Sequence, residues 1–432
     1  MAFDPSEVAS GQLPVVRLKS GEDGRLQAGH RWVFSNELVP LSGSGAALPP
    51  GAPCLLANAQ GRLLGFGHAN LQALLAVRLL AGTAGAYALL EGRLTEAELV
   101  AKLIRDSVAR RQSLMALGRQ AFRLIFSEGD DLPGLIVDRY GEILVVQILT
   151  AGMHRLREVV LDALMAATGC GHIFERTSGP YLAFEQLEER REWLRGGLAM
   201  PLHVPPGDGL PAMSIDLTSA QKTGAFLDQS DNRAWLAGWL LRRRAARPHD
   251  AGTTRLLDLF CYHAHWSATA LLTDAALEAC AVDSSAPALE SARATALLNG
   301  VEKRLSAVQA DVFEWLDASE SAGPWDVVVL DPPALTKNRK SVPVALKAYE
   351  KLNMQAMRRT AAGGLLITCS CSQHVEPEAF DQLLVRAARR AKRRVRVVHR
   401  GAQSVDHPIL LGMPETAYLK MVALEMMEGE GD

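Results

Sequence analysis

Paired cysteines, an excess of one charge and long apolar runs are all missing from this sequence. None of its six cysteines forms a CxxC pair, which excludes a zinc-ribbon site and a small disulfide framework. With 46 Lys and Arg against 48 Asp and Glu, the net charge of −2 gives no support for a nucleic-acid partner, although a neutral protein can carry a local basic face. No apolar run approaches the roughly 18 residues of a membrane span, and MAFDPSEVAS lacks a signal-peptide pattern. We therefore expect a cytoplasmic protein with no membrane partner and mostly free thiols.

The composition that is present is globular, and the chain divides into three parts by pattern. Hydrophobic residues make up 48% and charged residues 22%, and 432 residues exceed one ordinary core. Residues 13–82 show short apolar runs broken by turns, which predicts a small β-rich domain. Residues 92–206 begin with the capping box Thr95 to Glu98 and mix helix with strand, as in Ile143–Leu149. Residues 207–432 form the third predicted domain, and no internal repeat is visible.

The third part alternates apolar strands with helices. The strands are LLDLF at Leu256–Phe260, ACAVD at Ala279–Asp283, DVVVLD at Asp326–Asp331 and GGLLITCS at Gly363–Ser370. This pattern predicts an α/β fold with a mostly parallel, Rossmann-like sheet that is covered on both faces. Ligands of such sheets bind outside the carboxyl ends of the strands. We therefore look for function at those ends.

Four aspartates each lie at or near the carboxyl end of a predicted strand. They are Asp258, Asp283, Asp311 and Asp331. A single carboxylate there is usually an N-cap or turn residue, but four in strand order indicate a nucleotide-type site. Asp283 would accept hydrogen bonds from ribose hydroxyls, Asp311 would reach an adenine amino group, and Asp258 would lie near the methionine end of S-adenosylmethionine. A dehydrogenase would use the same sheet but needs GxGxxG for a pyrophosphate, and LDLFCYHAHWS contains no glycine.

The ends of the last two strands carry groups that fit covalent catalysis. Asp331-Pro332-Pro333 ends one strand, and Thr368-Cys369-Ser370-Cys371-Ser372 ends the next. Carbon 5 of a pyrimidine accepts a methyl group only after a thiolate adds at carbon 6, and that step needs a thiol and a nearby proton donor. Cys369 and Cys371 share a face if the strand alternates, so direction alone leaves both open. Amine methylation uses a similar Asp-Pro-Pro-aromatic segment, but Ala334 occupies the aromatic position here.

With these motifs the chain resembles a known family over nearly its full length, the bacterial large-subunit (23S) ribosomal RNA cytosine-5 methyltransferases. The matching segments, in family order, are GHRWVFSNEL, GFGHAN, DLPGLIVDRYGE, QKTGAFLDQSDNR, LDLFCY, AVDSSAPALESARATALLNG, DVVVLDPPALTK, GGLLITCSCSQHV and DHPILLGMPETAYLK. The resemblance implies a β-barrel PUA domain that binds RNA at 13–82, a central α+β domain at 92–206 and a class I methyltransferase domain that uses S-adenosylmethionine at 207–432.

The resemblance also implies roles for individual residues. The family pattern small-Ser-Cys-Ser before His-Val makes Cys371 the nucleophile, and Asp331 the group near the ring nitrogen. Residues expected near the cofactor or the target base, besides the four aspartates, are Lys222, Thr223, Phe226, Asp228, Gln229, Phe260, Tyr262 and Ser284. The substrate implied is structured RNA, 23S rRNA in particular, and a homodimer is a further expectation.

The loop after the first strand departs from the family. Where the family has a glycine-containing turn, this chain has His263-Ala264-His265. Ala264 allows close approach to a ligand if its φ is negative, and a positive φ at His265 would be uncommon. A repositioned loop, weaker cofactor binding and an inactive enzyme that serves as an RNA-binding assembly factor all stay open, as does methylation of another base. Two histidines without a third ligand do not make a metal site, so we expect none.

Basic and aromatic residues supply the candidate RNA contacts. The run from Arg386 to Arg400 holds eight Lys or Arg and no acid; such runs are either solvated helix faces or phosphate contacts. From it we select Arg393 and Arg394. Lys222 and Arg233 near the cofactor segment are further candidates. Trp32 would stack on a base, with core packing of the β-barrel as its alternative.

Overall fold

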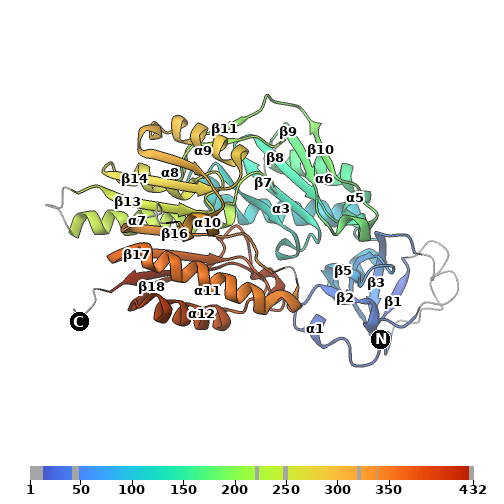
Figure 1. The fold of residues 1–432 in the computed structure, drawn as a ribbon. Helices are drawn as coiled ribbons and strands as arrows, with labels where there is room; N and C mark the ends of the chain where they lie inside the picture. Colours follow the sequence, from blue (N-terminus) through green and yellow to red (C-terminus); the bar gives the residue numbers. More distant parts are fainter. Residues whose placement is uncertain are drawn as a thin grey trace. The chain divides into compact units, whose positions relative to one another are not determined.

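The computed structural model describes residues 13–40, 48–218, 223–246, 252–318, 323–336 and 338–427, and these residues form two compact units (Figure 1). Unit 1 comprises residues 13–117, 121–199 and 406–416, and unit 2 comprises 118–120, 200–405 and 417–427 within the described ranges. No described helix combines the length and the apolar character that a bilayer crossing requires.

Unit 1 contains two five-stranded sheets. The first has the order β1-β3-β4-β5-β2, with β1 parallel to β3 and the other neighbours antiparallel. The second has the order β10-β9-β8-β7-β6, with β8 parallel to β9. The strands are β1 Val15–Arg17, β2 Trp32–Phe34, β3 Ala52–Ala57, β4 Leu63–Ala69, β5 Leu75–Gly82, β6 Ala121–Phe126, β7 Leu135–Tyr140, β8 Ile143–Ile148, β9 His172–Thr177 and β10 Arg190–Arg195.

The helices of unit 1 pack on these sheets, and the expected capping box is confirmed at the longest of them. Thr95 accepts a hydrogen bond from the Glu98 backbone, and the Glu98 side chain accepts one from Thr95 in return. The buried face of this helix, which includes Leu99 and Val108, joins the core of the second sheet. The helices are α1 Gly24–Gln27, α2 Thr83–Leu90, α3 Glu96–Arg110, α4 Gln112–Ala116, α5 Ala151–Arg155 and α6 Arg157–Thr168.

Residues 406–416 belong to unit 1, although the sequence pattern assigned them to the third domain. The buried Asp406 carboxylate accepts a hydrogen bond from the Arg123 backbone at 2.7 Å, and the Asp406 carbonyl accepts one from Arg111 at 2.7 Å. The His407 ring packs on Phe126, with ring centroids 5.1 Å apart. These partners lie almost 300 positions away in the chain, so no local pattern could reveal them.

Unit 2 is built on a seven-stranded sheet of order β15-β14-β13-β16-β17-β19-β18. The strands from β15 to β17 are parallel, and β19 runs antiparallel to both β17 and β18. The expected α/β sheet is confirmed, and its strand order reverses between β13 and β16. The strands are β13 Thr254–Leu259, β14 Leu277–Asp283, β15 Leu305–Gln309, β16 Trp325–Leu330, β17 Thr360–Ser370, β18 Val395–Gly401 and β19 Lys420–Met426, and a hairpin of β11 Leu202–Val204 with β12 Met213–Ile215 precedes them.

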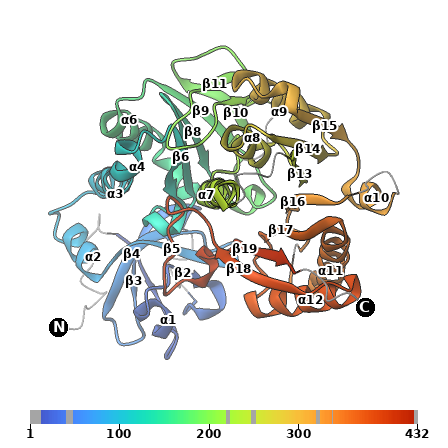
Figure 2. The ribbon, with the colours of Figure 1, turned by 90° about the vertical axis from the view of Figure 1, so that its left-hand side faces the viewer.

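Helices cover both faces of this sheet. On one face, α10, α11 and α12 pack on side chains such as Leu257 and Leu330; on the other, α7 and α8 pack on Leu256 and Val329. In both ribbon views α11 and α12 lie side by side (Figures 1 and 2). The helices are α7 Ser230–Ala246, α8 His265–Thr273, α9 Ala286–Leu298, α10 Val312–Asp317, α11 Val342–Arg359 and α12 Pro377–Ala391.

Candidate functional site

The carboxyl ends of β13, β14, β16 and β17 carry most of the residues that the sequence singled out. Asp258 is the residue before the last of β13, Asp283 ends β14, Asp331 follows β16 and Cys371 follows β17. In a parallel sheet these ends share one edge, and the order reversal between β13 and β16 is where such sheets form ligand crevices.

Asp258 is fully buried and only half satisfied. Its Oδ2 accepts hydrogen bonds from the Ser267 hydroxyl at 2.7 Å and the Ser267 backbone at 3.2 Å. Its Oδ1 has no hydrogen-bond partner among the described residues. Burial raises the pKa of Asp258 to about 7, although the Ser267 bonds oppose this. A buried acceptor without a partner is costly, so this carboxylate is placed for a purpose other than stability.

Asp283 organises the loop that follows β13. Its Oδ2 accepts a hydrogen bond from the Tyr262 backbone at 2.9 Å, and its Oδ1 accepts one from the Ser285 backbone at 2.9 Å. Each carboxylate oxygen has a second lone pair that can accept from another donor. The Tyr262 ring packs edge to face on Phe226, with centroids 5.1 Å apart. Ser284, the next residue, is exposed.

The loop itself has three non-glycine residues in the left-handed region. They are Phe260 at φ 60°, Tyr262 at φ 49° and Ala264 at φ 53°. Ala264 therefore does not take the negative φ that would have eased close approach, and His265 instead starts α8. Each such residue costs about 1–2 kcal/mol, and strain of this kind concentrates at functional sites.

The two histidines of this loop are buried and neutral. Burial lowers the pKa of His263 to about 3 and lowers that of His265 well below its usual range, with Arg233 and His263 adding to the second effect. Within the described part of the chain, His263 Nδ1 and His265 Nε2 have no hydrogen-bond partner. The Tyr262 and His263 rings stack with centroids 3.7 Å apart.

Asp311 is an N-cap residue, the ordinary structural role of a carboxylate at the end of a strand. It caps α10 by accepting from the Glu314 backbone at 3.1 Å. Its side chain is exposed, so the cap leaves room for a further donor. Phe260 contacts Phe313 of the same helix, with centroids 6.1 Å apart.

Asp331 is held by two donors on one oxygen. Gln229 donates to its Oδ2 at 2.9 Å and Trp266 donates at 3.3 Å. Gln229 is fixed in turn by Asn232, which donates to it at 2.6 Å. Asp228 accepts a hydrogen bond from the Tyr418 hydroxyl at 2.6 Å. The segment that resembles the family's cofactor cover is therefore anchored twice, by Gln229 to Asp331 and by Asp228 to Tyr418.

The two cysteines at the end of β17 have different surroundings. Cys369 is fully buried against the α7 and α8 face, and burial, with Asp331 adding, raises its pKa well above the usual range. The strand ends at Ser370, and Cys371 is partly exposed. Ser372 then turns toward α11, where its hydroxyl lies 2.9 Å from the Tyr349 hydroxyl. The alternation of side chains along β17 therefore ends between the two cysteines, and they need not share a face of the sheet.

The other sequence-predicted residues are more scattered. Lys222 lies outside the described residues. Thr223 is buried. Arg233 is only 2% exposed and donates to the Phe226 carbonyl at 3.1 Å and the Ser230 hydroxyl at 3.1 Å. Its guanidinium therefore holds the 226–230 segment in place and is not presented to solvent for a phosphate.

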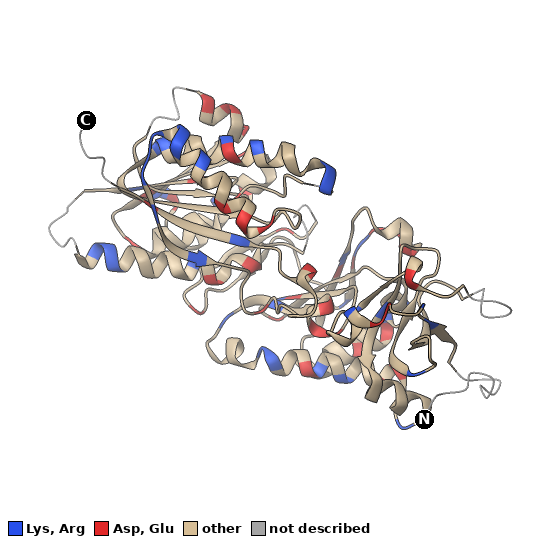
Figure 3. Cartoon of the chain, turned by 90° about the horizontal axis from the view of Figure 1, so that it is seen from below, with Lys and Arg blue, Asp and Glu red and all other residues tan. Residues whose placement is uncertain are grey.

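The predicted RNA contacts from the basic run lie away from the cysteines. Arg393 donates to the Thr360 carbonyl at 3.4 Å, at the start of β17, whereas Cys371 follows its end. Arg394 is exposed near the same edge. The run is not one helix, because α12 ends at Ala391 and β18 begins at Val395. Four arginines of the run form ion pairs with acids of the same unit, namely Arg386, Arg390, Arg396 and Arg400. Figure 3 shows basic and acidic residues interspersed along the chain.

Trp32 has a structural contact in unit 1. Its indole N–H donates to Glu128 at 2.8 Å, and the His30 ring packs edge to face on it. The half-buried indole thus joins the first sheet to the segment after β6.

Sequence reasoning missed four residues around this site. They are Trp266, Tyr349, Tyr418 and Lys420, which contact Asp331, Ser372, Asp228 and the Ser372 carbonyl respectively. Tyr418 and Lys420 lie in the matching segment DHPILLGMPETAYLK, which was the one available signal for them.

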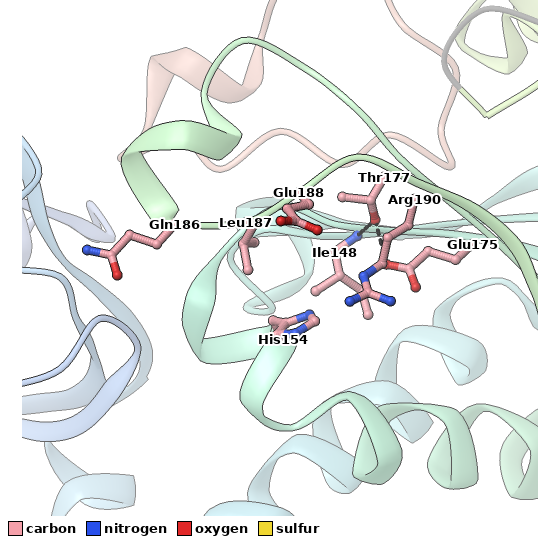
Figure 4. Close-up of a pocket in the computed structure, with 8 residues that line it drawn as sticks. All are labelled: Ile148, His154, Glu175, Thr177, Gln186, Leu187, Glu188 and Arg190. Carbon is pink, nitrogen blue, oxygen red and sulfur yellow. Dashed lines mark hydrogen bonds between the residues drawn. The ribbon is translucent and has the colours of Figure 1, made fainter.

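A separate pocket of about 180 Å³ lies in unit 1, away from the sequence-predicted residues. His154, Glu175, Glu188 and Arg190 line it together with Thr177 (Figure 4). The buried Glu175 accepts from Thr177 at 2.8 Å and lies 2.9 Å from Arg157. Its charge is therefore already balanced within the fold.

Comparison with known proteins agrees with this geometry. A model of PUA-like domains matches residues 16–81, and a model of S-adenosylmethionine-dependent methyltransferases matches residues 186–416. Proteins named ribosomal RNA large subunit methyltransferase I are 33% identical in Shewanella denitrificans and 31% identical in Shewanella frigidimarina, each over 94% of this chain and 97% of the relative.

Solved structures show the same fold. One from Streptococcus mutans, described as a SAM-dependent methyltransferase, has a TM-score of 0.75 at 18% identity over 96% of this chain and 100% of its own. A structure of SMU.776 in complex with SAH has a TM-score of 0.76, also at 18% identity, with 96% and 100% covered. By its sequence matches, the chain belongs to the family of the ribosomal RNA large subunit methyltransferase I proteins, with a PUA-like domain followed by an S-adenosylmethionine-dependent methyltransferase domain.

Proposed function

We propose that this protein methylates carbon 5 of a cytosine in large-subunit ribosomal RNA through a covalent adduct with Cys371. The relatives' name supports the RNA substrate. The observation that carries the chemistry is the contrast at the end of β17, where Cys371 is partly exposed and Cys369 is buried with a raised pKa. A nucleophilic cysteine must reach its substrate and ionise, and Cys371 meets the first requirement where Cys369 does not.

The residues present fit S-adenosylmethionine. Asp258 offers a buried oxygen without a partner, and Asp283 offers lone pairs at the position that receives ribose hydroxyls. Asp311 is exposed beside Phe260 and Phe313, as suits an adenine ring and its amino group. When bound, the cofactor supplies an electrophilic methyl group.

Cys371 and Asp331 divide the work on the base. The Cys371 thiolate forms a bond to carbon 6, and the displaced electron pair moves into the ring, where a proton shared with Asp331 neutralises the developing charge at nitrogen 3. Carbon 5 becomes enamine-like and takes the methyl group. Loss of the carbon-5 proton to a base then reforms the double bond and expels the thiolate, which restores Cys371. Gln229 and Trp266 keep the Asp331 carboxylate oriented throughout.

The test is a map of methylated bases in rRNA from a strain that lacks the gene. We expect one cytosine-5 mark to be missing, and to return with the wild-type gene and with Cys369→Ala but not with Cys371→Ala. An unchanged map, a missing mark on another base, or equal loss from both cysteine variants would contradict the proposal.

A second candidate is an RNA-binding assembly factor that keeps the fold without turnover. The observation in its favour is the glycine-free loop with Phe260, Tyr262 and Ala264 at positive φ, because such strain can weaken cofactor binding. Calorimetric titration of the folded protein with S-adenosylmethionine separates the two. Measurable binding favours the enzyme, and absence of binding favours the assembly factor.

A further inference from the structure

Lys420 is placed against the segment that carries Cys371. In the β17–β19 ladder it pairs with Ser370, the residue before the cysteine. Its Nζ donates to the carbonyl of Ser372, the residue after it, at 2.9 Å, and to the Tyr418 carbonyl at 3.0 Å. The Lys420 backbone is thus paired with the residue before the cysteine, and its ammonium group is bonded to the residue after it.

The electrostatics of this ammonium point to a negative partner. Two carbonyls use two of its three N–H donors. Burial lowers the pKa of Lys420, and negative charge opposes this lowering, chiefly at Cys371 when its thiol is ionised and then at Glu376. A partly buried ammonium is retained where an anion compensates for its lost hydration.

Among the described residues, several other titratable groups interact with this cysteine pair or with Lys420, and these are acids or neutral hydroxyls and thiols. They are Asp331 after β16, Asp228 in the Leu227–Gln229 turn, Cys369 in β17, Tyr349 in α11 and Glu376 before α12. Negative neighbours oppose ionisation of a thiol. Among the groups named here Lys420 is a cation, and a positive charge beside a thiol favours the thiolate.

We propose that Lys420 is a positioning residue that holds Cys371 as a reactive thiolate. The thiol gives its proton to solvent, and Lys420 keeps all three of its own, so the pair is an ammonium and a thiolate with no net charge. This inference rests on the proposed function, in which Cys371 is the nucleophile, and adds the group that activates it.

The test measures alkylation of Cys371 by iodoacetamide across pH in the full chain, with the modified peptide quantified by mass spectrometry. The wild-type rate should rise with a midpoint below the roughly 8.5 of an ordinary cysteine. Lys420→Met keeps an unbranched side chain of nearly the same length without the charge. It should raise that midpoint by about one pH unit and slow alkylation at pH 7 about tenfold. Lys420→Arg should keep the low midpoint. A purely structural role for Lys420 would leave the midpoint unchanged.

Three outcomes would overturn the inference. They are a wild-type midpoint at or above that of an ordinary cysteine, an unchanged midpoint in a folded Lys420→Met variant, or a midpoint in Lys420→Arg as high as in Lys420→Met. The wild-type measurement stands even if Lys420→Met fails to fold. Methyl transfer by Cys371→Ala would instead refute the proposed function, and the alkylation assay does not depend on it.

Discussion

Replacing Asp258 by Asn should stabilise unit 2 at alkaline pH, because the native carboxylate is buried at a cost. Its pKa is about 7 in the folded protein against 3.8 for an ordinary aspartate. The folded state therefore keeps a proton that the unfolded chain has lost, and the stability of the wild type falls as pH rises between these values. At 1.36 kcal/mol per pH unit, the rise from pH 5 to pH 7 removes about 2.7 kcal/mol. Asn stays neutral, and its Oδ1 can accept the hydrogen bonds that Ser267 donates.

Two buried histidines change the stability in the opposite direction over the same pH range. Burial lowers the pKa of His263 to about 3 and also lowers that of His265. Their contribution to stability is present above the unfolded pKa of about 6.5 and is lost as pH falls below it. The wild-type curve alone therefore mixes two trends. The difference between Asp258→Asn and the wild type isolates the carboxylate.

The assay is urea unfolding without cofactor at pH 5 and pH 8, followed by tryptophan fluorescence. Unit 2 holds five of the seven tryptophans, namely Trp235, Trp239, Trp266, Trp315 and Trp325. The variant should gain about 2.7 kcal/mol relative to the wild type between these pH values, while its affinity for S-adenosylmethionine falls. If the unfolding free energies of the two proteins changed equally between pH 5 and pH 8, a raised pKa at Asp258 would be refuted.

Three further changes have definite expected results. Ala264→Gly relieves left-handed strain of about 1–2 kcal/mol, but it removes a buried methyl group and increases the entropy of the unfolded chain, so the free energy of urea unfolding should change by no more than about 1 kcal/mol. The control Ala268→Gly, in α8, should lower that free energy by about 2 kcal/mol. Equal losses in the two variants would argue against strain at Ala264. Gln229→Met removes a donor to Asp331, and methyl transfer should fall on the order of tenfold or more with little change in cofactor affinity, as single-turnover rates would show. Arg111→Met breaks a buried ion pair with Asp130, and unit 1 should lose about 3 kcal/mol in thermal or urea unfolding; an unaltered midpoint would contradict this.

The sequence predicted the strands of unit 2 well because they are buried on both faces. The run Val327–Leu330 is apolar at every position, which is typical of a strand buried on both faces, and its short length favours a strand over a helix. The basic run from Arg386 was harder, because its charges meet acids such as Glu350 of α11 that the linear pattern does not place beside it. For the same reason the sequence did not reveal that residues 406–416 belong to unit 1, where Asp406 binds Arg111 and Arg123.

The candidate site was predictable where residues end strands and unpredictable where the backbone turns. Alternation placed Cys369 and Cys371 on one face, but β17 ends at Ser370 and the rule stops with it. The glycine-free loop gave no sign that Phe260 and Tyr262, as well as Ala264, take positive φ. Lys420 enters the site through an antiparallel strand pair, which depends on long-range register.

The most direct test of the central claim is covalent capture of the target base. Large-subunit rRNA that contains 5-fluorocytidine, incubated with the protein and S-adenosylmethionine, should form a stable adduct, because fluorine at carbon 5 cannot leave as a proton. Peptide mapping of that adduct should place the RNA bond on Cys371 and show a methyl group on the base. An adduct on Cys369, or normal methylation of ordinary rRNA with no adduct on the fluorinated one, would contradict the account.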